Sequence, residues 1–212
     1  MLTSFVCCRN ATAMDKPRLF RSYTTSGIEG SLNTPIWETV RATTATPGVF
    51  KRIQIQQNGL TEEFLDGSFG SKNPTKLLLN EAAEVFGPNS EVSCIVSIGS
   101  GKQQPIDISS QSFFHRVVPT QVVSGLKKMA FDGEQIATEV EQKCDSTPHL
   151  YFRFDAEDGL DNVGFGQWQK VPEVESWTLD YLRDVDAEKK AMGTAYALYG
   201  NVTGKATISM LA

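Results

Sequence analysis

Apolar and polar positions along the chain follow two periods, one typical of strands and one typical of helices. Strand-like runs alternate with helical segments in the first half, and helical spacing dominates the second half. Residues 92–98 are mostly apolar and uncharged, which favours a buried strand in a parallel sheet. The pattern predicts strands at residues 3–8, 19–23, 49–54, 61–65, 92–98 and 149–154, and helices at about 34–42, 73–86, 173–185 and 187–199.

The ends of two helices carry clear signals. Thr34-Pro35 predicts a helix start with Thr as the N-cap and Pro at the first helical position, where a missing N–H costs nothing. A second helix starts at Asn73-Pro74 and stops at Gly87-Pro88. The polar segments 102–112 and 155–172 are predicted to be loops within one sheet system rather than linkers between domains.

A carboxylate follows one of the predicted strands directly. The apolar residues Phe64 and Leu65 lead into Asp66, and Gly67 and Ser68 continue as a turn of small residues. Open α/β sheets place ligand-binding and catalytic groups at the carboxyl ends of their strands, which makes Asp66 a candidate for chemistry. Asp-Gly is also ordinary turn chemistry, so a purely structural Asp66 is the alternative.

Four segments together resemble patatin-like lipid acyl hydrolases. Residues 36–50, which include Trp-Glu-Thr-Val-Arg-Ala-Thr-Thr-Ala-Thr-Pro, resemble the W-x-x-x-R-A-T-S-A-A-P-x-x-F stretch of that family. Residues 19–23 resemble its FRSY strand. Asp66-Gly67-Ser68 followed by Asn73-Pro74 resembles its DGG or DGA turn with NP, although Ser68 stands where Gly or Ala is expected. Residues 96–101 resemble its SLGTG strand end.

The resemblance implies a fold and a domain organisation. It predicts an α/β protein, a three-layer α/β/α sandwich with a mostly parallel central sheet that is incomplete at its N-terminal side. Residues 1–212 would form a single partial domain. Residues 1–101 would hold the sheet core with the Asp turn, and residues 102–212 a mainly helical remainder.

The resemblance also implies a chemistry. Members of the family hydrolyse the acyl esters of phospholipids and other glycerolipids with a Ser–Asp dyad. By that analogy Asp66 is the catalytic general base, and Gly67 and Ser68 shape the active-site turn. A carboxylate within hydrogen-bond reach of a serine hydroxyl can take its proton. The resemblance implies neither a metal nor a diffusible cofactor.

The serine of such a dyad has no counterpart here. The family carries it on a G-x-S-x-G elbow, behind a Gly-rich oxyanion loop, and this sequence contains neither. Ser97, for example, has Gly99 after it but Ile95 before it. We therefore expect the chain to be a fragment that supplies the Asp of a phospholipase-like site and is inactive alone. A non-catalytic lipid- or protein-interaction module of the same fold is the alternative.

Composition limits the partners. The net charge of −5 argues against nucleic acid and against a polybasic membrane patch. No apolar run approaches the roughly 20 residues that span a bilayer, and the N-terminus lacks the pattern of a signal peptide. These features predict a cytoplasmic chain with no transmembrane segment. They are compatible with peripheral contact with a membrane. The four cysteines have no C-x-x-C spacing and are predicted to be free thiols.

Three weaker signals complete the candidates. Gly99-Ser100-Gly101-Lys102 resembles part of a phosphate-binding loop, but Val96 and Gln103 stand where that motif needs Gly and Ser or Thr. The cluster 113–115 (Phe-Phe-His) is predicted to line the core or an apolar groove. Arg41 is predicted to form a structural ion pair or to position the loop near Asp66, and the sequence does not separate these roles.

Overall fold

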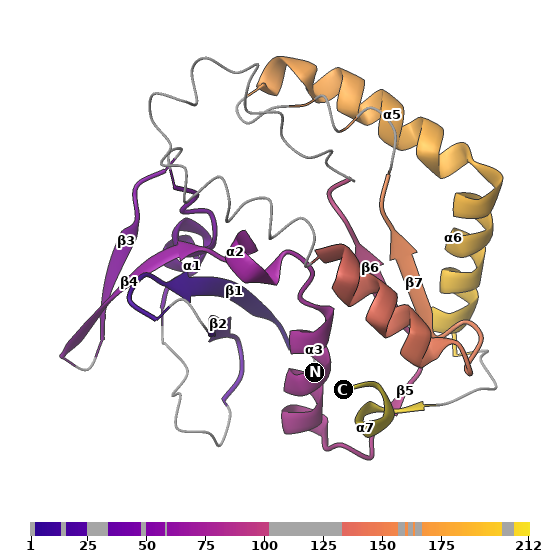
Figure 1. Ribbon diagram of the computed structural model, residues 1–212, viewed down its shortest axis with the longest axis horizontal. Helices are drawn as coiled ribbons and strands as arrows, with labels where there is room; N and C mark the ends of the chain where they lie inside the picture. Colours follow the sequence, from indigo (N-terminus) through magenta and orange to yellow (C-terminus); the bar gives the residue numbers. More distant parts are fainter. Residues whose placement is uncertain are drawn as a thin grey trace. The chain divides into compact units, whose positions relative to one another are not determined.

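The computed structural model describes residues 3–13, 16–24, 34–47, 50–57, 59–101, 133–156, 160, 163, 167–200 and 206–212 (Figure 1). The chain divides into two compact units. The first unit comprises Met1–Pro74 and Asp107–Gln135, and the second comprises Thr75–Ile106 and Ile136–Ala212. Each unit has a hydrophobic core of its own. That residues 1–212 form one domain, divided into 1–101 and 102–212, stays a prediction.

The first unit is built on a four-stranded sheet. Its strands are β1 (Phe5–Asn10), β2 (Pro17–Arg21), β3 (Ile53–Gln57) and β4 (Leu60–Asp66), in the order β2-β1-β4-β3. Every neighbouring pair is antiparallel. The first unit also contains α1 (Ile36–Thr43) and the short α2 (Ser68–Ser71), which follows β4 directly (Figure 1).

The predicted three-layer sandwich with a mostly parallel central sheet is wrong. Only residues 11–16 join β1 to β2, and only residues 58–59 join β3 to β4. Such connections join antiparallel neighbours, because a parallel pair needs a crossover of about a dozen residues or more. The sequence does contain a signal for the second of these connections, since Asn58-Gly59 is a strong hairpin dipeptide. Gly59 has the positive φ of +78° that such turns require.

The core of the first unit lies between the sheet and α1. Cys8, Phe20, Ala42, Ile55 and Phe64 are buried together, and the rings of Phe20 and Phe64 meet edge to face with centroids 5.2 Å apart. Because Ala42 is small, the last turn of α1 can approach the sheet closely. The N-cap of α1 is Pro35 and no side chain caps its first turn, so the predicted Thr34 cap is wrong.

The second unit contains the remaining elements. β6 (Ile95–Ile98) pairs in parallel with β7 (Tyr151–Phe154). This confirms the parallel direction predicted within residues 92–98 but not the burial, because Val96 and Ile98 are exposed. A second pair, β5 (Glu91–Val92) and β8 (Ala206–Thr207), is antiparallel. The helices are α3 (Thr75–Phe86), α5 (Val171–Arg183), α6 (Val185–Leu198) and α7 (Ile208–Leu211), with a 3₁₀ turn η4 (Trp168–Lys170). Residues 136–144 of this unit are also helical, and the helix begins at residue 133 in the first unit.

Helix positions in the second unit follow the sequence signals closely. α5 and α6 lie within two residues of their predicted starts and ends. Asp184 separates them and caps α6, because its carboxylate accepts hydrogen bonds from the N–H groups of Asp186 (2.9 Å) and Ala187 (3.4 Å). Among the described residues, no helix has both the length and the apolar character needed to cross a membrane.

Candidate functional site

The turn at Asp66 joins two of the motifs on which the resemblance rests. Asp66 ends β4 and lies opposite Cys8 of β1. The segment that follows α1 is hydrogen-bonded to this strand end: the Asp66 N–H donates to the Ala45 carbonyl (3.2 Å) and the Gly67 N–H to the Thr43 carbonyl (3.3 Å). Residues 43–46 and 66–67 are thus held against each other by backbone contacts, although twenty residues separate them in sequence.

Both oxygens of the Asp66 carboxylate have a hydrogen-bond donor. Oδ1 accepts the Ser68 N–H at 2.8 Å, which is the Asx turn expected of an Asp followed by a small residue. Oδ2 accepts the hydroxyl of Thr46, a buried residue. Asp66 therefore stabilises the turn, as the structural alternative predicts. Its catalytic role, together with that of Gly67 and Ser68, stays a prediction.

Gly67 is required by close packing rather than by its backbone angles. Its φ of −64° is available to any residue. A Cβ at this position, however, would lie 2.0 Å from the carbonyl oxygen of Cys7 and 2.7 Å from its carbonyl carbon. The same carbonyl oxygen accepts the hydroxyl of Thr43 at 2.7 Å, so the Cys7 backbone is held in place. Only glycine fits between Asp66 and Ser68 without moving β1.

Arg9 supports the other side of the turn. Ser68 opens α2, which is kinked where Phe69 and Gly70 leave helical angles, with φ of +91° at Gly70. The buried Arg9 of β1 donates from Nε to the Phe69 carbonyl, and a Cβ at Gly70 would lie 2.3 Å from its Nη2 atom. The sequence analysis missed Arg9. Its acceptor is a main-chain carbonyl sixty residues away, and no local pattern reveals such a partner.

The thiol beside Asp66 is not a nucleophile. Cys8 is fully buried, and burial raises the pKa of its thiol, with smaller upward contributions from Cys7 and Asp66 and an opposing one from Arg18. Since the thiolate is the reactive form, Cys8 stays protonated and inert at neutral pH. All four cysteines of the chain are free.

Arg41 holds the chain that leaves the same segment. Its Nη2 donates to the Lys51 carbonyl, and its guanidinium lies 5.7 Å from the centre of the Phe50 ring. These contacts connect the last turn of α1 to the residues that precede β3. Arg41 therefore holds residues 50–51, and its predicted role in positioning the loop near Asp66 stays a prediction.

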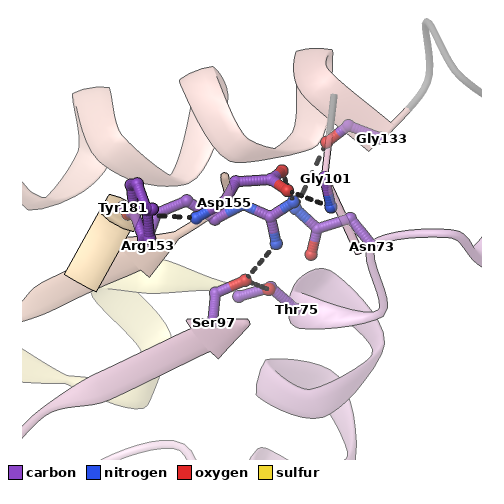
Figure 2. Close-up of polar contacts among 8 residues, drawn as sticks. All are labelled: Asn73, Thr75, Ser97, Gly101, Gly133, Arg153, Asp155 and Tyr181. Carbon is purple, nitrogen blue, oxygen red and sulfur yellow. Dashed lines mark hydrogen bonds and ion pairs between the residues drawn. The ribbon is translucent and has the colours of Figure 1, made fainter. Parts of the chain in front are cut away.

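A second polar cluster lies at the carboxyl ends of β6 and β7 in the second unit (Figure 2). Arg153 donates to the Ser97 hydroxyl oxygen (2.8 Å) and pairs with the Asp155 carboxylate (2.5 Å). That carboxylate also accepts the Gly101 N–H at 2.8 Å, and the Asp155 N–H donates to the Tyr181 hydroxyl at 3.3 Å. Figure 2 also draws a contact within the first unit, from the Asn73 side-chain amide to the Gly133 carbonyl (3.2 Å).

This cluster suits neither a nucleophilic serine nor a phosphate loop. The Ser97 oxygen accepts from Arg153 and from the Thr75 hydroxyl (3.5 Å), and a guanidinium cannot take a proton from it. A Cβ at Gly99 would lie 2.2 Å from the Asp155 Oδ1 atom, so a carboxylate already stands where a phosphate would approach the glycines. Residues 102 and 113–115, which belonged to the weaker candidates, lie outside the described residues.

The part of the chain that the structure describes contains no candidate metal site. No group of three or more His, Cys, Asp or Glu side chains there is arranged to hold a metal ion. The carboxylates of Asp66 and Asp155 are instead satisfied by donors from the protein.

Curated relatives of the chain are phospholipases. Phospholipase A I of Arabidopsis thaliana is 26% identical over 178 residues, which cover 76% of this chain and 12% of that protein. Calcium-independent phospholipase A2-gamma of Mus musculus is 27% identical over 144 residues (66% and 17%), and its Rattus norvegicus counterpart is 32% identical over 94 residues (42% and 12%). No protein-family model matches the chain, and no solved structure matches it significantly.

These similarities cover only part of each relative. The chain spans less than a fifth of the length of these relatives. It is distantly related to patatin-like phospholipases over that part of their sequence.

Proposed function

We propose that Asp66 is the general base of a Ser–Asp site that hydrolyses the acyl esters of phospholipids or other glycerolipids. The serine and the oxyanion donors would come from residues outside this sequence, which contains no G-x-S-x-G. The distant similarity to phospholipases supports the substrate class. The observation that carries the proposal is the carboxylate fixed at the end of β4 by the Thr46 hydroxyl and the Ser68 N–H.

The proposed step is a proton transfer coupled to acyl transfer. Asp66 accepts the proton of the serine hydroxyl as the serine oxygen bonds to the ester carbonyl carbon, and the proton then passes to the departing alcohol. Each carboxylate oxygen has two lone pairs, so the contacts with Thr46 and Ser68 leave acceptor capacity for the serine. Backbone N–H donors at the tetrahedral oxyanion would supply much of the remaining rate enhancement.

A chimera with a relative tests this role. The part of this chain that aligns with the mouse phospholipase, over 144 residues, replaces its counterpart in that protein, and hydrolysis of a fluorogenic phospholipid is measured. We expect turnover in the chimera and a loss of about 10²–10⁴-fold with Asp66→Asn, the usual worth of general-base catalysis. Asp180→Asn is the matched control, because the Asp180 side chain is 68% exposed and lies on α5. An Asp66→Asn chimera with full turnover would refute the proposal.

A non-catalytic interaction module is the second candidate, and α1 is the observation that favours it. Three apolar side chains on this helix are exposed: Ile36 (83%), Trp37 (65%) and Val40 (52%). Trp is well suited to a membrane interface because its ring is apolar and its N–H is polar. Under this candidate the isolated chain sediments with phosphatidylcholine vesicles, and Trp37→Ala with Ile36→Ser abolishes sedimentation. The matched change, at two exposed side chains of α6, is Tyr196→Ala with Met192→Ser.

A further inference from the structure

Thr46 makes a contact that the turn itself does not require. The turn is already held by three hydrogen bonds, from the N–H groups of Asp66, Gly67 and Ser68. The Thr46 hydroxyl adds a fourth, to the second oxygen of the Asp66 carboxylate. Thr46 is only 8% exposed, so water offers little competition for this contact.

The backbone holds Thr46 in place for this contact. Its N–H donates to the Thr44 carbonyl (2.8 Å), and its carbonyl accepts the Phe50 N–H (2.9 Å). The preceding residue, Ala45, is fully buried, and its carbonyl accepts the Asp66 N–H. Hydrogen bonds on both sides therefore fix the position of the hydroxyl relative to the end of β4.

Among the three threonines of this segment, Thr46 is the one whose hydroxyl contacts the Asp66 carboxylate. In the stretch that resembles W-x-x-x-R-A-T-S-A-A-P, Thr46 stands where the motif has the Ala that precedes its Pro. The neighbouring threonines use their hydroxyls elsewhere: Thr43 donates to the Cys7 carbonyl, and Thr44 to the Val40 carbonyl at 2.8 Å. Of these three hydroxyls, the one that replaces the Ala contacts the carboxylate.

We infer that Thr46 is a positioning residue that fixes the plane of the Asp66 carboxylate. Rotation about the Cβ–Cγ bond of an Asp is broad, so one donor on one oxygen limits it only partly. Two donors on different oxygens, the Ser68 N–H and the Thr46 hydroxyl, fix the carboxylate plane. The open lone pair of Oδ2 then has a defined direction toward a serine hydroxyl. The role in catalysis rests on the proposed function of Asp66, and the effect on the carboxylate does not.

Nuclear magnetic resonance of the full chain tests the effect on the carboxylate. In Thr46→Val, which keeps the shape and removes the hydroxyl, the Asp66 carboxyl carbon shifts and the Ser68 amide exchanges with solvent about tenfold faster, since its charged acceptor is less well held. Amides that pair β1 with β2 keep their wild-type exchange. Thr46→Ser restores both signals, and Thr46→Ala repeats the loss without a branched side chain. Thr44→Val is the matched control and leaves the Ser68 amide unchanged.

The outcomes decide between positioning and its alternatives. A Ser68 amide that is unchanged in Thr46→Val and Thr46→Ala, or is disturbed equally by Thr44→Val, overturns the inference. In the phospholipase chimera, Thr46→Val should lower kcat roughly tenfold at unchanged KM, and Thr46→Ser should recover it. A higher kcat in Thr46→Val would mean that the hydroxyl competes with the serine for Oδ2, which also overturns the inference. Full turnover in Asp66→Asn refutes the proposed function and leaves the magnetic resonance result unaffected.

Discussion

Gly67 and the carbonyl of Cys7 are in such close contact that a side chain at Gly67 would overlap the backbone of β1. The missing Cβ would lie 2.0 Å from the Cys7 oxygen. Because of this close contact, the Gly67 N–H reaches the Thr43 carbonyl. The hydroxyl of Thr43 in turn donates to the Cys7 carbonyl. Gly67 is therefore the point at which β1, the segment after α1 and the Asp66 turn meet.

Gly67→Ala should destabilise the protein and displace the turn. Because the clashing atoms belong to the backbone, we expect the free energy of unfolding to fall by about 1–3 kcal/mol, the range of overpacked sites. Urea denaturation measures this change. Gly133→Ala is the matched control: its Cβ would meet Lys72 at an ordinary 3.6 Å, and a helical Ala costs nothing relative to Gly. Equal stability of the two variants would contradict the role of close packing.

Asp66→Asn should have a measurable effect on stability as well as the effect on turnover. An Asp in an Asp-Gly turn is expected to be exposed and to have little influence on folding. In the structure Asp66 is half-buried and accepts two hydrogen bonds, of which Asn can keep the one from Ser68. We expect a loss of roughly 0.5–1.5 kcal/mol in the free energy of unfolding, the net value of one hydrogen bond. A loss of turnover accompanied by unfolding would contradict a specific role for the carboxylate.

The chain alone should not react with a serine-directed fluorophosphonate probe. Ser97 accepts hydrogen bonds from Arg153 and Thr75 and has no base among these partners, and the Ser68 N–H rather than its hydroxyl contacts Asp66. Mass spectrometry of the treated chain would detect the adduct, and the chimera provides the positive control. An adduct that disappears in Ser97→Ala or Ser68→Ala would identify that serine as a nucleophile and contradict the inertness expected from its contacts.

Stability should decline above about pH 9 because of the buried thiols. Burial raises the pKa of Cys8, Cys94 and Cys144 above the ordinary value of 9.0, so the folded state keeps protons that the unfolded chain releases. These thiols therefore do not change stability below that pH. Stability falls as the pH rises through it, by up to about 1.4 kcal/mol per pH unit for the fully buried Cys8 and by less for the partly exposed Cys94.

Cys8→Ala isolates the contribution of one thiol. Urea denaturation of the reduced protein at pH 7, 8, 9 and 10 gives the free energy of unfolding for the wild type and the variant. We expect the variant to be less stable at pH 7, because it loses a buried group, and the difference to shrink above pH 9. A difference that stays constant over this range would contradict a raised thiol pKa.

Local structure followed from local sequence. Apolar periodicity located most strands and helices, and Asn73-Pro74 and Gly87-Pro88 mark helix ends that the structure contains. The resemblance to patatin-like hydrolases was likewise carried by contiguous motifs, and the distant similarity to phospholipases agrees with it. These features depend on residues close together in the chain, whose steric and hydrogen-bonding preferences act before any tertiary contact forms.

Strand pairing and the partners of Asp66 depended on tertiary structure. Apolar runs indicate that strands are buried but leave their direction open. The short links make β1 and β2, and β3 and β4, antiparallel pairs, whereas the pairing of β1 with β4 joins segments far apart in the chain and is set by tertiary structure. The sequence by itself determined that a carboxylate ends a strand at Asp66. Only the tertiary structure brought Thr46 to its second oxygen and Arg9 to the turn beyond it, because both contacts join segments whose approach is set by packing in the core of the first unit.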